Sequence, residues 1–221
     1  MSNLHYDSEY FAWQKDMGSF GGKANTFKFL KSIKKDDCVV DFGCGGGFLL
    51  KNLECRRKIG IEINLSASKT IQQNGVEWFD SAQSLIDQAG EGFADVIISD
   101  NVLEHTPCPL FELKSLRSIL KKNGIIHFVV PCDNISLKYK PNDINNHLYS
   151  FSPMNLGNLF TEAGYTVQKV KPYIHKWPPY YRAIQNIFGW RIFNIFCRVY
   201  GRIDRDWYQV EIIATKSHDE G

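Results

Sequence analysis

Two features of this 221-residue chain could bind a nucleoside: a glycine-rich run and a carboxylate that follows it. The run Asp41-Phe42-Gly43-Cys44-Gly45-Gly46-Gly47 stands between an expected strand and an expected helix. Glycine has no Cβ and tolerates positive φ, so the backbone can approach a ligand closely at a helix N-terminus. Glu62 ends the next expected strand. A carboxylate there can accept two hydrogen bonds from a ribose diol.

Two cofactor classes compete for this loop. A dinucleotide fingerprint reads G-x-G-x-x-G and needs its last glycine to fit helix to strand, but Phe48 occupies that position. A pyrophosphate site also does not call for an acid just before the loop, whereas Asp41 suits a cofactor with a cationic amino acid part. Both points favour S-adenosylmethionine over NAD.

Three histidines are candidate general bases, because transfer of a group to a hydroxyl requires removal of a proton, whereas transfer to a carboxylate or phosphate oxygen does not. We expect His147 and His105 to be catalytic, with Asp143 as an aid and Tyr149 in a similar place; His175 is expected at the surface. The alternative for His105 and His147 is a hydrogen bond that fixes a helix start or a loop. No cysteine or histidine lies at metal-ligand spacing, so no metal site is expected.

The elements that would position these residues alternate along the chain. Strands are predicted at 38–42, 59–62, 75–79, 94–99, 125–130, 165–171 and 209–215. Helices are predicted at 8–17, 23–34, 48–53, 65–73, 81–89, 109–121 and 153–163. Gly18, Gly21 and Gly22 are expected to break the chain after the first helix, and Asn123-Gly124 to end the helix at 109–121. This alternation predicts an α/β fold with a mostly parallel sheet, helices on both faces and ligands at the carboxyl ends of the strands.

Composition places the chain among ordinary globular proteins, with 43% hydrophobic residues, 23% charged residues and a net charge of +2. The polar amino terminus does not resemble a secretory signal, and no stretch has the roughly 18 apolar residues of a membrane span. Six cysteines without a CxxC pair indicate free thiols in a reducing cytoplasm. We therefore expect a cytoplasmic protein, monomeric or homodimeric, without a nucleic-acid partner.

Five motifs in order resemble class I S-adenosylmethionine-dependent methyltransferases, and within that class the small-molecule group. They are VVDFGCGGGFLL, IGIEIN, ADVIISDNVLEHTPCPL, LKKNGIIHFVVP and NHLYSFSPMNLGNLFTEAGYTV. The resemblance covers about residues 36–173 and a last strand at 207–216. It implies a Rossmann-like seven-stranded sheet whose last strand is antiparallel.

The resemblance also implies the roles of individual cofactor-binding residues. Asp41, Gly43, Cys44 and Gly45 would hold the methionine part of S-adenosylmethionine, and Glu62 its ribose. Ile63 would pack on the adenine ring and Asp80 would bind the adenine amino group, although a helix N-cap is the alternative for Asp80. Asp100 and Asn101 would line the pocket at the end of the fourth strand.

Two segments depart from a minimal methyltransferase domain, which is assigned to residues 36–221. Residues 1–35 are expected to form a helical cap, and residues 174–205 an aromatic and basic insertion. From Ala163 to Ile203 the chain has seven lysines and arginines and no acid. The insertion is interpreted as a lid over the acceptor pocket, as a dimer contact, or, through 177–202, as a peripheral contact with anionic lipid at the inner membrane face.

The expected function is therefore methyl transfer to a small, anionic acceptor. Resemblance to bacterial enzymes of surface-polysaccharide biosynthesis favours an oxygen of a sugar, nucleotide-sugar, or capsule or lipopolysaccharide precursor. One alternative is a quinone or other lipid at the membrane surface. The other is a cofactor-binding regulatory or scaffold protein without catalysis.

Overall fold

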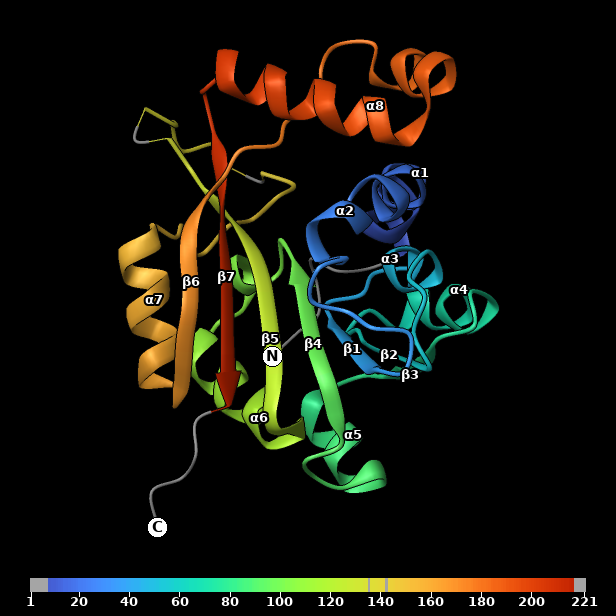
Figure 1. The fold of residues 1–221 in the computed structure, drawn as a ribbon, viewed down its shortest axis with the longest axis vertical. Coiled ribbons are helices and arrows are strands. Elements are labelled where there is room, and N and C mark those ends of the chain that lie inside the picture. Colours follow the sequence, from blue (N-terminus) through green and yellow to red (C-terminus); the bar gives the residue numbers. More distant parts are fainter. Residues whose placement is uncertain (1–7, 135, 142, 217–221) are drawn as a thin grey trace.

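The computed structural model describes residues 8–134, 136–141 and 143–216, in which seven strands form one twisted sheet (Figure 1). The strands are β1 (Cys38–Phe42), β2 (Arg57–Ile61), β3 (Glu77–Phe79), β4 (Ala94–Asp100), β5 (Leu120–Cys132), β6 (Tyr165–Tyr173) and β7 (Tyr208–Lys216). Their order is β3-β2-β1-β4-β5-β7-β6. The pairs among β1 to β5 are parallel, and β7 is antiparallel to both β5 and β6. The predicted seven-stranded, Rossmann-like sheet with an antiparallel last strand is confirmed.

The helices lie between and around these strands. They are α1 (Ser8–Ala24), α2 (Thr26–Phe29), α3 (Phe48–Lys51), η1 (Leu65–Ala67), α4 (Ser68–Gln73), α5 (Ala82–Ala89), η2 (Leu103–His105), α6 (Pro109–Ile119), α7 (Pro153–Glu162) and α8 (Tyr181–Ile203). The two short 3₁₀ helices, η1 and η2, follow β2 and β4 at the edge of the sheet where parallel folds bind ligands.

The sheet is buried on both faces, because alternate residues of its central strands enter two different cores. Val40 and Ile97 pack with α5, α6 and α7 on one face. Val39 and Ile98 pack with α1, α2, α3 and α4 on the other. Successive side chains of a strand point to opposite faces, so continuous apolar strands such as ADVIIS require helices on both sides. This is the physical basis of the three-layer architecture.

The glycines at positions 18, 21 and 22 do not break the chain, as the sequence suggested, but lie inside α1. They allow close packing instead. A Cβ on Gly22 would stand 2.5 Å from Cβ of Phe48, and one on Gly18 would stand 3.2 Å from its ring. The absence of side chains on this face of α1 therefore makes room for Phe48 at the start of α3.

Two helix ends also differ from the prediction. The helix predicted at 23–34 is reduced to α2, a single turn. α6 ends at Ile119 rather than at Asn123-Gly124, and β5 begins directly at Leu120. Asn123 adopts a positive φ of 62° within this strand, and the pairing of β4 with β5 is irregular between Ala94 and Val96.

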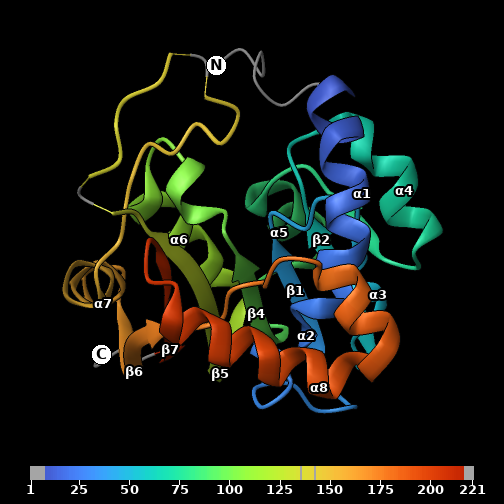
Figure 2. The ribbon, with the colours of Figure 1, turned by 90° about the horizontal axis from the view of Figure 1, so that it is seen from above.

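α8 lies across the carboxyl edge of the sheet, as Figure 2 shows from above. Its inner side packs on α1, where Phe20 is surrounded by Trp177, Tyr181, Trp190 and Phe193 at ring-centroid distances of 4.9–5.7 Å. Gly189 kinks the helix with a φ of 74°. The α8 insertion and α1 thus form one aromatic cluster above the sheet.

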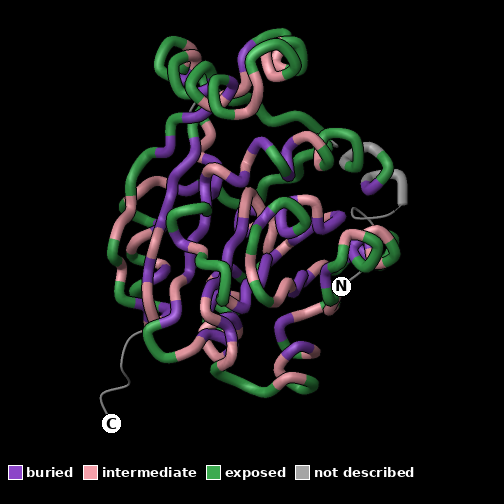
Figure 3. The backbone as a smooth tube through the Cα atoms, turned by 45° about the vertical axis from the view of Figure 1, so that its right-hand side comes forward, coloured by how far each residue is buried: buried purple, intermediate pink, exposed green. Residues whose placement is uncertain are grey.

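The side of α8 that faces away from the sheet is apolar and exposed, and most of the helix is coloured exposed or intermediate in Figure 3. We call this set the outer apolar face of α8: Ile187, Phe188, Ile192, Ile195, Phe196, Val199 and Ile203, each 41–76% exposed. Four exposed arginines lie on the same helix: Arg182, Arg191, Arg198 and Arg202. Among the described residues, no helix is long and apolar enough to cross a membrane.

His175, expected at the surface, is in fact buried, in the segment between β6 and α8. Its Nε2 lies 3.0 Å from Oδ1 of Asn194, and only 7% of the residue is exposed. Burial lowers the pKa of His175 to about 4, and the positive charges of Lys28 and Arg198 lower it further. His175 is therefore a neutral structural residue.

Candidate active site

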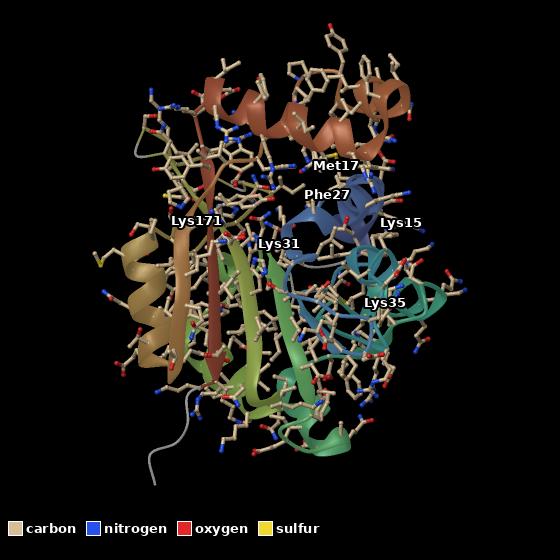
Figure 4. All side chains as sticks on the ribbon, in the orientation of Figure 1. Lys15, Met17, Phe27, Lys31, Lys35 and Lys171 are labelled. Carbon is tan, nitrogen blue, oxygen red and sulfur yellow. The ribbon has the colours of Figure 1, made fainter. Side chains whose placement is uncertain are left out.

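The carboxyl ends of β1, β4 and β5 open into a cavity of about 540 Å³. Its wall and roof come from α1 and from the segments on either side of α8, with Met17, Trp177 and Trp207 among the lining residues. Met17, a residue of α1, lies on the side of that helix toward α8 (Figure 4), and its sulfur is 3.8 Å from the Tyr181 hydroxyl. The volume is that of a small-molecule site, and it lies where parallel sheets bind ligands.

The glycine loop forms the floor of this cavity. Gly43 and Gly45 have φ values of 73° and 53°. Residues with a Cβ rarely adopt this region of backbone conformation. The backbone N–H groups of Gly43 and Cys44 both donate to the Ile61 carbonyl. A Cβ on Gly43 would stand 2.4 Å from the side chain of Val102. The loop is therefore held tightly between β2 and the segment after β4.

The wall of the cavity is acidic. Asp41, Asp100, Glu104 and Asp133 line it, and its described lining includes neither lysine nor arginine. Burial raises the pKa of Asp41 well above its usual value, and the carboxylates of Asp100 and Glu62 raise it further. Such a wall favours a ligand that carries positive charge.

Asp100 is an acid of this wall that forms an ion pair with a lysine. Nζ of Lys28 donates to Asp100 Oδ1 at 2.6 Å, and the Asn25 amide donates to Oδ2 at 2.7 Å. These bonds attach the N-terminal helical segment, at Asn25 and Lys28, to the end of β4. Asn101 follows with a φ of 57°, and its side-chain oxygen accepts a hydrogen bond from Gln209 on β7.

Glu62 is placed to hold a diol at the end of β2. Its Oε2 accepts a hydrogen bond from the Gly45 N–H at 2.8 Å, and its Oε1 accepts one from the Asn64 N–H at 2.9 Å. Burial raises the pKa of this carboxyl, while these backbone donors act in the opposite direction. A carboxylate offers about four lone-pair sites, so Glu62 keeps capacity for a ribose while it braces the glycine loop.

The residues predicted to contact adenine lie beside Glu62 but outside the cavity. Ile63 is 47% exposed, and the Glu62 N–H donates to the carbonyl of Phe79, next to Asp80. Asp80 is exposed and accepts a hydrogen bond from the Ser81 hydroxyl. Ser81, rather than Asp80, is the N-cap of α5. Ile63 and Asp80 thus flank an open surface beyond Glu62.

Two histidines meet in the wall of the cavity. His105 ends η2 and His147 lies on the polar loop after β5, and their ring centroids are 5.1 Å apart. Nδ1 of His147 lies 3.0 Å from Oδ2 of Asp133. Nε2 of His105 lies 3.5 Å from Oε1 of Glu104. Burial raises the pKa of Glu104 to about 8, to which Asp100 and Asp133 contribute.

The structure therefore brings His105 and His147 together, with carboxylates that were not among the predicted site residues. Asp143 is half-buried and is not part of the cavity wall. The carboxylate on His147 is Asp133, the residue after Pro131-Cys132 at the end of β5. Glu104 stands in the VLEH motif itself, and a turn of 3₁₀ helix directs it inward. The position of each residue shortly after a strand, Asp133 after β5 and Glu104 after β4, was the sequence signal that could have indicated it.

Comparison with known proteins identifies the family to which the chain belongs. A family model described as a methyltransferase domain matches residues 22–170, more than half of the chain. The chain belongs to this methyltransferase family. Its class uses S-adenosylmethionine as methyl donor, in agreement with the resemblance of the five motifs.

Individual relatives are distant. A ubiquinone biosynthesis O-methyltransferase of Histophilus somni is 33% identical over 105 residues, which are 41% of this chain and 43% of that protein. The chain thus matches less than half the length of this curated relative. The methyltransferase in a complex with the Haloferax volcanii Trm112 activator has a TM-score of 0.67 at 16% identity, over 95% of this chain and 98% of that one. A Thermotoga maritima S-adenosylmethionine-dependent methyltransferase has a TM-score of 0.63 at 17% identity, over 94% and 96%.

The residues of the cavity fit S-adenosylmethionine. Glycines without Cβ atoms leave room beside the loop. The acidic wall near Asp41, whose described lining has no lysine or arginine, suits the α-ammonium and sulfonium groups of the cofactor. Glu62 retains acceptor capacity for the ribose. A dinucleotide would bring a pyrophosphate next to Asp41, which the acidic wall opposes. Phe48, at the position of the last glycine of the dinucleotide fingerprint, is packed against Gly18, Gly22 and Gly46.

Proposed function

We propose that this protein transfers the methyl group of S-adenosylmethionine to a hydroxyl oxygen of a small acceptor. The observation that carries the proposal is the pair of histidines that line the cavity, with Glu104 and Asp133 as their carboxylate partners. An acceptor hydroxyl there would lie between the methionine site at Asp41 and Gly45 and the imidazole of His147. A hydroxyl needs such a proton acceptor, whereas a phosphate or carboxylate oxygen does not.

The chain's own residues would act by position, charge and proton transfer. S-adenosylmethionine, when bound, supplies an electrophilic methyl group on a sulfonium. Asp41 and the glycine loop hold the methionine part, and Trp177 and Trp207 exclude water from above. Asp133 orients His147 through Nδ1, so that its other nitrogen can take the hydroxyl proton. In the transfer the C–O bond would form as the C–S bond breaks, and the C–S electron pair would remain on sulfur.

The acidic wall favours an acceptor whose reacting end is uncharged. An anionic group that entered the cavity would meet the acids Asp41, Glu104 and Asp133 and, among the described lining residues, no lysine or arginine. The anionic part of the acceptor would instead lie outside, toward the arginines of α8. A sugar hydroxyl of a nucleotide-linked or lipid-linked polysaccharide precursor has this arrangement, with phosphate groups remote from the methylated oxygen.

A second candidate is methylation of a quinone or other lipid at a membrane surface. The outer apolar face of α8 and its four arginines favour it, because aromatic and basic residues together bind anionic lipid interfaces. The printed name of the Histophilus somni relative, which concerns ubiquinone biosynthesis, points the same way. In this arrangement α8 would rest on the membrane and the acceptor would reach the cavity beneath it.

The test is methyl transfer from isotope-labelled S-adenosylmethionine to three acceptor groups: nucleotide sugars, lipid-linked sugars and hydroxylated quinone precursors. We expect labelled product with at least one hydroxyl acceptor and none after substitution His147→Ala. Binding of S-adenosylhomocysteine without turnover on any acceptor would favour the non-catalytic alternative.

Membrane contact is tested by sedimentation with vesicles of phosphatidylglycerol and of phosphatidylcholine alone. We expect binding to the anionic vesicles, and loss of binding after Ile195→Glu on the outer apolar face. Phe111→Glu is the matched control, since Phe111 is an exposed apolar residue of α6. Equal sedimentation of the two variants would remove α8 as the contact.

A further inference from the structure

Glu104 presents a buried carboxyl group whose oxygens the described part of the chain leaves without a hydrogen-bond partner. The residue has no exposed surface, and neither of its carboxylate oxygens has a hydrogen-bond partner among the described residues. Its Oε1 faces Nε2 of His105 at 3.5 Å. Buried polar atoms in native proteins are almost always paired, and a buried anion without hydrogen bonds is strongly unfavourable. This carboxylate therefore calls for a partner from outside the chain.

His105 and His147 complete a set of metal-ligating groups around it. One ligand atom from each of Glu104, His105 and His147 can be chosen so that all three lie within 4.8 Å of one another. Ligand atoms around a tetrahedral Zn²⁺, with bonds of about 2.0–2.2 Å, stand about 3.4 Å apart. From a spacing of 4.8 Å, closing the set requires two ligand atoms to approach each other by about 1.4 Å. His147 lies on an exposed loop, where such a movement is easy.

Each histidine is also held as a metal ligand normally is. His147 has its Nδ1 on the carboxylate of Asp133 at 3.0 Å, and His105 has its Nδ1 next to the backbone carbonyl of Asn146 at 3.4 Å. A hydrogen bond from one ring nitrogen to a carboxylate or carbonyl fixes the tautomer that presents the other nitrogen to a metal. Two such arrangements side by side are a second observation, independent of the unsatisfied Glu104.

We propose that Glu104, His105 and His147 bind one divalent transition-metal ion, of the Zn²⁺ or Fe²⁺ type. Two imidazoles and one carboxylate are the ligands that these ions prefer, whereas Mg²⁺ prefers oxygen ligands and water. Three protein ligands leave coordination positions open, and all three residues line the cavity. Residue spacing alone does not reveal this site, because Glu104 and His147 lie far apart in the chain and meet only when the loop after β5 folds back.

The role of the ion rests on the proposed methyl transfer, whereas its binding does not. At an open position the ion would hold the acceptor hydroxyl and lower its pKa. His147 would then be a metal ligand instead of the base. The hydroxyl proton would pass to water at the exposed loop, the oxygen would form the bond to the methyl carbon, and the C–S electron pair would stay on sulfur. Hydroxyl groups on adjacent carbons, as in a sugar diol or a catechol, would bind such an ion best.

The alternative is a cluster without metal, in which a protonated Glu104 donates a hydrogen bond to His105. The loop would then be fixed by the bonds already present, including those from the Leu148 and Tyr149 N–H groups to the Glu104 carbonyl. This alternative predicts no metal affinity at the site, so metal binding separates the two.

The experiment measures metal binding to the full chain after removal of any affinity tag and treatment with chelator. Zn²⁺ is titrated calorimetrically, Co²⁺ is followed by its visible absorption, and Mg²⁺ is the comparison ion. The variants are Glu104→Gln and His147→Gln, with Glu112→Gln as matched control, because Glu112 is a half-buried glutamate of α6 outside the cavity wall. S-adenosylhomocysteine binding and the melting temperature of each variant report on the fold.

We expect one Zn²⁺ or Co²⁺ per chain and much weaker Mg²⁺ binding. Glu104→Gln and His147→Gln should each lower Zn²⁺ affinity at least tenfold, and Asp133→Asn by about 10–100-fold, as for partners of metal-bound histidines. Glu112→Gln should leave it unchanged. Because every variant keeps all six cysteines, binding to thiols would be equal in all of them.

The proposal is overturned if Zn²⁺ does not bind to protein that binds S-adenosylhomocysteine, or if Glu104→Gln and His147→Gln bind it as tightly as the natural sequence. Zn²⁺ binding that depends on Glu104, in a protein that fails to bind S-adenosylhomocysteine, would instead retain the metal site and refute the proposed methyl transfer.

Discussion

Substitution Gly22→Ala should destabilise the protein, although alanine is the better helix former. A methyl group at this position would stand 2.5 Å from Cβ, 2.6 Å from the carbonyl carbon and 2.7 Å from the oxygen of Phe48. Two of these atoms are backbone, so α1 itself must move. Overpacking of this kind costs about 1–3 kcal/mol, and a contact with backbone belongs at the upper end. The gain in helix propensity offsets about 1 kcal/mol.

The expected net loss is about 2 kcal/mol of unfolding free energy, which lowers the melting temperature of a chain of this size by about 4–8 °C. Binding of S-adenosylhomocysteine should weaken as well, because Gly22 and Phe48 both line the cavity. Denaturation by urea and calorimetric titration measure the two effects.

Gly157→Ala is the matched control for this substitution. Gly157 also lies inside a helix, α7, but a Cβ there would meet only Val170 at an ordinary 3.6 Å. This variant should gain up to about 1 kcal/mol from helix propensity. If Gly22→Ala proves as stable as Gly157→Ala, the argument that the glycine face of α1 makes room for Phe48 is refuted.

Three further outcomes are expected from the described contacts. Glu62→Ala should weaken S-adenosylhomocysteine binding by one to two orders of magnitude, since charge-assisted hydrogen bonds contribute about 1.5–3 kcal/mol; calorimetry that finds equal affinity would remove Glu62 from the site. His175 has a folded pKa of about 4 against 6.5 when unfolded, so the unfolded chain binds the extra proton between these values. Stability should fall by about 3 kcal/mol on acidification from pH 6.5 to 4, and urea titrations of His175→Gln should not show this component. Phe193→Ala, at a position 1% exposed in the aromatic cluster, should lower the unfolding free energy by about 3–5 kcal/mol and speed amide exchange in α8; unchanged exchange would show that the cluster does not hold this helix.

The fold was predictable where one local signal dominated. Short apolar runs that contain Val39-Val40 and Ile97-Ile98 favour buried strands, and their alternation with helices leaves few arrangements. The glycines of α1 were misread, because glycine ends helices in isolation but also permits close contact. Their contact with Phe48 joins residues that the sequence keeps apart. Tertiary packing there outweighs the local preference of the chain.

The cofactor end of the site was predictable for a related reason. Asp41, the glycine loop and Glu62 each stand directly at the end of a strand, so the sheet alone brings them together. The acceptor end depends on a loop that returns to η2. The sequence indicated His105 and His147, but the choice between Asp133 and Asp143 required the path of that loop. Burial of Glu104 likewise depends on the turn of η2 and has no signature in composition.

The position of β7 has a consequence for how the chain is made. This strand lies between β5 and β6 in the sheet, yet it follows α8 in the sequence. While the ribosome is still synthesising residues 174–207, β5 exposes one edge and β6 has no neighbour, so α7 and β6 cannot join the rest of the sheet. Unpaired edges of this kind are prone to wrong association. Completion of the domain is therefore delayed until Lys216 has left the exit tunnel, and pausing or premature termination before that point would yield a chain whose first half is folded and whose second half is exposed to proteases and chaperones.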